Sequence, residues 1–80
     1  MTETTTFHER MSTARDRWAL WCAKHGIDPR TATVRQVQDA VLDHRLAGLD
    51  VDDAVDLLDA AAVASGTWRD TRILEMRRSL

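Results

Sequence analysis

The residues of this chain best suited to chemistry are a cysteine and a histidine one helical turn apart, Cys22 and His25. A thiol beside an imidazole can act as nucleophile and base, and the same pair is half of a zinc site. A third group must orient the base in catalysis, and the other histidines, His8 and His44, form no second pair at ligand spacing. Cysteine is among the most buried residue types, so we interpret the pair as core packing.

The glycines give no sign of a phosphate-binding loop, because Gly26, Gly48 and Gly66 are isolated from one another. The paired carboxylates of the chain are typical of a solvated helix surface. We therefore expect no enzymatic activity, no metal, no cofactor and no small-molecule substrate.

An acidic face is the first candidate binding surface. Residues 49–66 contain five aspartates and no basic residue. Asp52, Asp56 and Asp59 are spaced by four and three residues, with Asp53 beside them, so on a helix they should share one face that points away from the core. Three interpretations stay open: solubility, docking of a basic protein partner, and pairing with the arginine-rich C-terminal segment of the same chain.

Arginines form the second candidate surface, which would contact DNA phosphates. A net charge of −2 weighs against a nucleic-acid-binding protein, and exposed arginines are commonly only solvated. The candidate residues are Arg10, Arg15, Arg17, Arg30, Arg35, Arg69 and Arg72.

Four helices are expected to position these surfaces, because each glycine follows a segment with helical periodicity. The first begins at the capping box Thr6-x-x-Glu9 and ends at Gly26; the second begins at Thr33-x-x-Gln36 and ends at Gly48. The third is capped by Asp50 and runs to about Ser65, and the fourth begins at Thr67-x-x-Asp70. The sequence predicts an all-α, compact bundle forming one domain over residues 1–80, with residues 1–5 as a frayed tail.

The apolar positions of each expected helix predict its buried face. We expect the third helix to be central, because its alanines at 60–62 let a neighbouring helix approach closely. The predicted faces comprise Phe7, Met11, Ala14, Trp18, Trp21 and His25; Val34, Val37, Ala40, Val41 and Leu46; Val51, Ala54, Val55, Leu58, Ala61 and Ala62; and Ile73, Leu74, Met76 and Leu80.

Composition favours a small cytoplasmic globular protein. The chain has 80 residues, of which 44% are hydrophobic and 30% charged. Its one cysteine cannot form an internal disulfide, which fits a reducing compartment. No stretch resembles a secretory leader or a membrane span.

The order of landmarks resembles the N-terminal, SAM-like core-binding domain of tyrosine recombinases (phage integrases). A bulky residue at Trp18, then Trp21-Cys22 and Gly26, is followed by Pro29, and the similarity covers residues 14–80. Further matching landmarks are Ala32, Val37, Val41, Gly48, Ala54, Val55, Ala61 and Ala62. The resemblance implies a helical domain that clamps DNA, without the catalytic domain that carries the Arg, His and Tyr residues of that family. Aspartates stand here where the third helix of the family offers a hydroxyl to phosphate.

Two functions follow from these observations. The aspartates and the net charge favour a non-enzymatic interaction module of bacterial or phage type, which binds a protein partner through the acidic face or an exposed apolar surface. The family resemblance favours the alternative, a DNA-associated accessory or regulatory protein.

Overall fold

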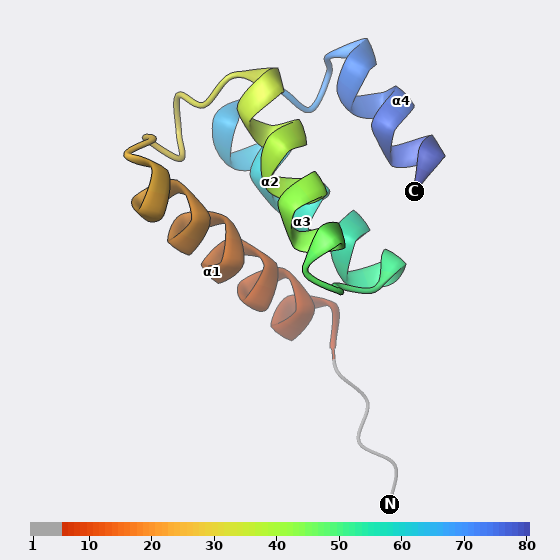
Figure 1. Ribbon diagram of the computed structural model, residues 1–80. Coiled ribbons are helices and arrows are strands. Elements are labelled where there is room, and N and C mark those ends of the chain that lie inside the picture. The colour runs from red at the N-terminus through yellow and green to blue at the C-terminus, as the bar shows by residue number, and fades with distance from the viewer. Residues whose placement is uncertain (1–5) are drawn as a thin grey trace, which may run out of the picture.

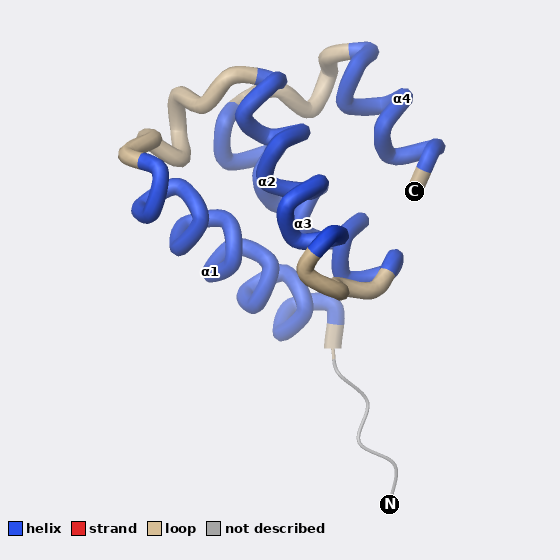
Figure 2. The backbone as a smooth tube through the Cα atoms, in the orientation of Figure 1, coloured by secondary structure: helices blue, strands red, loops and turns tan. Residues whose placement is uncertain are grey.

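The computed structural model describes residues 6–80, and this part of the chain contains four helices and no strand (Figures 1 and 2). The helices are α1 (Phe7–His25), α2 (Val34–Leu46), α3 (Val51–Ser65) and α4 (Thr71–Ser79). The predicted all-α bundle is confirmed for these residues. The predicted frayed tail, residues 1–5, lies outside the described residues.

The helix starts follow from side chains that cap free backbone amides. The hydroxyl of Thr6 accepts from the Glu9 amide, and Thr33 and Gln36 form a complete, reciprocal capping box. Asp50 and Asp70 cap α3 and α4. These local interactions explain why the starts of α1, α2 and α3 were predictable.

Glycines in the left-handed conformation end two of the helices. Gly26 ends α1 with φ 66°, and Gly66 ends α3 with φ 72°. After Gly26, the amide of Ile27 donates to the carbonyl of Cys22 at 2.9 Å, which satisfies a carbonyl of the last turn. These two predicted helix ends are confirmed, and so is the third, because α2 ends at Leu46 just before Gly48, which has φ 103°.

The predicted start of α4 is wrong by one turn. Residues 67–70 form a turn in which the Asp70 amide donates to the Thr67 carbonyl at 2.9 Å, and the helix begins at Thr71. The hydroxyl of Thr67 is engaged with Ser65 instead, at 2.9 Å, so it does not cap the helix. Asp70 takes that role because its carboxylate accepts from the Arg72 amide.

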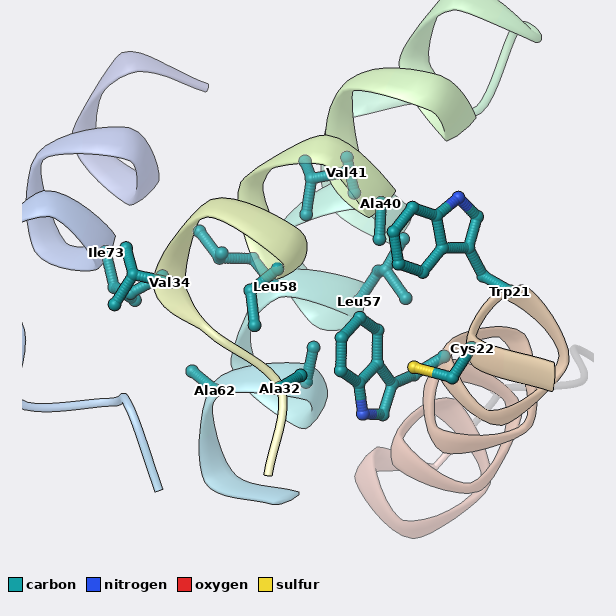
Figure 3. Close-up of a cluster of buried hydrophobic side chains, with 14 residues drawn as sticks. Trp21, Cys22, Ala32, Val34, Ala40, Val41, Leu57, Leu58, Ala62 and Ile73 are labelled. Carbon is teal, nitrogen blue, oxygen red and sulfur yellow. The ribbon is translucent and has the colours of Figure 1, made fainter. Parts of the chain in front are cut away.

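Helix α3 is the central element, as predicted, since it contacts α1, α2 and α4. Its fully buried leucines, Leu57 and Leu58, lie between Trp21 of α1 on one side and Val34 of α2 on the other (Figure 3). Helix α4 contributes Ile73, which lies beside Val34. The remaining buried apolar residues are Ala14, Trp18, Cys22, Ala32, Val37, Ala40, Val41, Ala54, Ala60, Ala61 and Ala62.

Both buried indoles have hydrogen-bond partners. The Trp18 Nε1 donates to the Pro29 carbonyl at 3.2 Å, which ties α1 to the following loop. The Trp21 Nε1 donates to the Asp43 carboxylate of α2 at 2.9 Å, and its ring stacks on Trp18 with a centroid distance of 5.8 Å. The tryptophans therefore join α1 to its neighbours by polar contacts as well as by apolar burial.

Several predicted core positions are wrong. Phe7, His25, Leu46 and Val51 are exposed, while Leu57, which was left out of the predicted face of α3, is completely buried. Val55 and Met11 are only partly buried, and Leu74 is exposed. Met76 and Leu80 are partly buried but pack against the core, as predicted. For Val51 and Leu57 the physical reason is that α3 packs against three helices. Its buried surface is therefore wider than one apolar stripe and is rotated away from Val51.

Candidate interaction surfaces

Cys22 and His25 do not form a catalytic pair. The Cys22 side chain is completely buried, and this burial raises the pKa of its thiol. His25 is exposed, stacks on the Trp21 ring at 4.2 Å, and donates from Nδ1 to the Trp21 carbonyl at 2.8 Å. The thiol therefore lacks both an accessible surface and a hydrogen bond from the imidazole within residues 6–80.

The acidic face, defined as Asp52, Asp53, Asp56 and Asp59, does not lie wholly in solvent. Asp56 is only 5% exposed, which contradicts the prediction that it points away from the core. Its carboxylate accepts two hydrogen bonds from Arg10 of α1, at 3.0 Å from Nε and 2.9 Å from a terminal nitrogen. The pair raises the pKa of Arg10, chiefly through the hydrogen bond to Asp56. A buried carboxylate needs such a bidentate partner to offset its lost hydration.

A second carboxylate of the acidic face is also engaged within the chain. Asp59 is partly buried and accepts hydrogen bonds from Arg77 of α4, at 2.9 and 3.3 Å. Of the three interpretations left open by the sequence, pairing with the C-terminal segment is confirmed for this residue.

The remaining acidic residues gather at the start of α3. Asp52 is exposed and Asp53 is partly buried, and both lie beside Asp50, the helix cap. Together with Arg10 they line a shallow polar hollow. Carboxylates are favoured in the first turn of a helix, so their position has a structural reason of its own.

Three of the seven candidate DNA-contacting arginines hold carboxylates. Arg10 binds Asp56, and the side chain of Arg35 lies 3.5 Å from Asp39. Arg72 binds Asp70 at 2.9 Å, and this hydrogen bond lowers the pKa of Asp70 from 3.8 to about 2. Each of these cations is neutralised locally, which reduces its attraction for phosphate.

The other four candidates are spread over separate segments. Arg15 and Arg17 are both on α1. Residues two positions apart in an α-helix are separated by about 200° around the helix axis, so these two side chains point to different sides. Arg30 is in the loop after α1, and Arg69 is in the loop before α4, with its guanidinium 4.5 Å from the centre of the Trp68 ring. Within residues 6–80 these arginines form no ion pair, and the helix positions do not bring Arg15 and Arg17 to one face.

An apolar groove, about 510 Å³ in volume, lies on the surface of the bundle. From the sequence we expected an exposed apolar surface as one of two protein-binding surfaces but did not predict where it lies. The lining of the groove comes from α1, α3, α4 and the loop between α3 and α4, and includes Phe7, Met11, Val63, Trp68 and Leu74. Phe7 is 71% exposed and Trp68 is 49% exposed, although aromatic side chains are usually buried to a large extent. The one available signal was Trp68, which stands outside every predicted apolar stripe.

The groove has one carboxylate among its lining residues, Asp59, and two cations, Arg15 and Arg77. Arg77 neutralises Asp59, whereas Arg15 makes no ion pair in the described part of the chain. Arg69 is not itself a lining residue, but its guanidinium lies against the ring of the lining residue Trp68. The local charge at the edge of the groove is therefore positive, in contrast to the chain as a whole.

Comparison with known proteins finds no matching family model, no similar curated protein and no similar solved structure. Among residues 6–80, no three His, Cys, Asp or Glu side chains gather as the ligands of a metal would. The helices in this part of the chain are too short or too polar to cross a membrane.

Proposed function

We propose that this chain is a small non-enzymatic interaction module that binds apolar side chains of a protein partner in the groove between α1, α3 and α4. The observation that carries the proposal is the gathering of exposed Phe7, Val63, Trp68 and Leu74 around one concave surface. Contiguous apolar surface is costly to leave in water and commonly marks a binding site. Tryptophan and arginine, both present here, are the residues that most often dominate binding energy.

The groove supports protein binding better than the acidic face does. Asp56 and Asp59 already bind arginines of the same chain, so a basic partner would have to displace them. Only Asp52 and Asp53 would be left to attract such a partner, at one end of α3. We therefore place the protein-binding function in the apolar surface.

The resemblance to the core-binding domain of tyrosine recombinases remains part of the proposal as a SAM-like helical architecture. It is supported by the landmarks Trp21 and Cys22, which lie in the C-terminal part of α1, and Gly26, which ends that helix. The four-helix order is compatible with that class. We place the module in the cytoplasm, because its single cysteine is a buried free thiol.

A selection from a library of random displayed peptides tests the proposed function. We expect recovered peptides to be rich in apolar residues and to lose at least tenfold in affinity when Trp68→Ala or Leu74→Gln is introduced. Leu20→Ala is the matched control, because Leu20 is exposed on α1 and is not among the residues that line the groove. Circular dichroism must show that each variant stays folded. Peptides whose binding ignores both groove variants, or a selection that recovers no binder, would refute the proposal.

A further inference from the structure

The side chains that line the groove indicate what kind of partner would bind in it. This inference rests on the proposed function, binding of a protein partner in the groove. The floor is formed by α3, which presents Ala60, Val63 and Ala64. Phe7 and Met11 of α1 form one wall, and Leu74 of α4 belongs to the other. An apolar channel bounded by helices accepts a further helix by ordinary helix packing, with apolar side chains at every third or fourth position facing inward.

The charges at the edge favour an acidic occupant. Arg15 lines the groove and has no carboxylate partner among residues 6–80, whereas the second lining arginine, Arg77, is matched by Asp59. Arg69, which is also unpaired in this part of the chain, does not line the groove but lies against the lining residue Trp68. Asp59 is the one carboxylate among the lining residues. The other acidic residues of the flanking helices do not line the groove: Glu9, Asp16, Asp52, Asp53, Asp56 and Glu75. A partner that carries carboxylates beside its apolar stripe would therefore gain attraction, whereas lysines in the same positions would face like charge.

We infer that the groove binds an acidic amphipathic helix of another protein. Trp68 is its aromatic anchor, and the guanidinium of Arg69 lies close to that ring. Apolar residues of the partner fill the channel between Phe7 and Leu74, and its carboxylates lie toward Arg15 at the groove and Arg69 beside Trp68. A cation near an aromatic surface at an interface adds both apolar contact and charge attraction.

Two synthetic helical peptides of about 18 residues provide the probes. Both carry leucine at positions i, i+3, i+4 and i+7; one has glutamates beside this stripe and the other has lysines. Binding of each to the full chain is measured by fluorescence anisotropy at low and physiological salt. We expect the glutamate peptide to bind at least tenfold more tightly at low salt, and its advantage to shrink as salt is added.

Matched variants assign the preference to the groove. Arg15→Glu should weaken binding of the glutamate peptide about five- to tenfold, the effect of reversing one exposed charge near a bound charge. Lys24→Glu makes the same change in net charge farther along α1, outside the lining of the groove, and should change affinity by less than about twofold. Trp68→Ala should abolish measurable binding of either peptide.

Several outcomes would overturn the inference. If the lysine peptide binds equally well, or if only library-selected peptides without acidic residues bind in a groove-dependent way, the acidic partner is wrong while the proposed function stands. If neither designed nor selected peptides bind, both fail. A dimer in sedimentation analysis that Trp68→Ala dissociates would make a second copy the occupant. If duplex DNA displaces the glutamate peptide from the chain, the arginines at the groove bind phosphate instead of an acidic helix.

Discussion

The position of Leu57 allows a decisive test of how α3 is oriented in the bundle. The apolar pattern of the sequence placed Leu46 of α2 in the core and left Leu57 out of it. The structure reverses these assignments, because Leu57 is completely buried and Leu46 is 87% exposed. Both residues are in helices, so replacing each by alanine removes the same atoms and brings the same gain in helix propensity.

The expected cost of Leu57→Ala follows from its burial. The substitution removes three buried side-chain carbons, and losing the burial of each costs about 0.8 kcal/mol of stability, which gives about 2.4 kcal/mol. A cavity of about 40 Å³ that neighbouring side chains do not fill adds about 1 kcal/mol. The sum, about 3–4 kcal/mol, is a large share of the roughly 4–12 kcal/mol expected for a domain of 80 residues. Leu46→Ala should change the free energy of unfolding by less than about 0.5 kcal/mol.

Urea and thermal unfolding followed by far-ultraviolet circular dichroism provide the measurement. For Leu57→Ala we expect the midpoint temperature to fall by about 12–30 °C, at about 4–8 °C per kcal/mol for a domain of this size. The urea slope should stay the same in both variants, since the surface exposed on unfolding hardly changes. Equal destabilisation by the two substitutions, or a larger effect of Leu46→Ala, would refute the packing described for α3.

Three further results are expected. Trp21→Ala removes a buried ring that stacks on its neighbours and should cost about 3–5 kcal/mol, so that an unchanged melting curve would contradict its role in the core. Arg72 lowers the pKa of Asp70 to about 2, so this carboxylate stabilises the fold above about pH 4 and loses its contribution as the pH falls through 2. The stability of Asp70→Asn, measured by unfolding as a function of pH, should lack this component. Superimposable stability curves for the variant and the unchanged protein would refute the assignment. Micromolar protein should not bind duplex DNA of mixed sequence in an anisotropy assay, and binding that weakens steeply with salt would favour the DNA-associated alternative.

The local features of the fold were predictable because their causes are local. Thr6, Thr33 and Asp50 cap helices through side chains that reach amides three residues away. Gly26 and Gly66 end helices because glycine has no Cβ and so adopts the left-handed backbone conformation without a steric penalty. The start of α4 was missed because two polar residues, Thr67 and Asp70, both suit a cap, and only the contact between Thr67 and Ser65 decides between them.

The orientation of α3 was less predictable because apolar residues occur all around this helix. Alanines and valines leave a weak periodic signal, so the contacts with three other helices determine which positions are buried. The same reasoning applies to Asp56, whose partner Arg10 is 46 residues away in the sequence. The location of the groove was missed for a related reason, since its lining is assembled from three helices and a loop.

The ion pair between the half-exposed Arg10 and the buried Asp56 is linked to the groove through the first half of α1. Arg10 lies between Phe7 and Met11 in the sequence, and those two residues line the groove. The two hydrogen bonds from Arg10 to Asp56 attach this part of α1 to α3 in one register, a role in which buried ion pairs are better supported than as sources of net stability. Asp56, one of the four acidic residues predicted for docking, thus positions the part of α1 that lines the groove where we place binding.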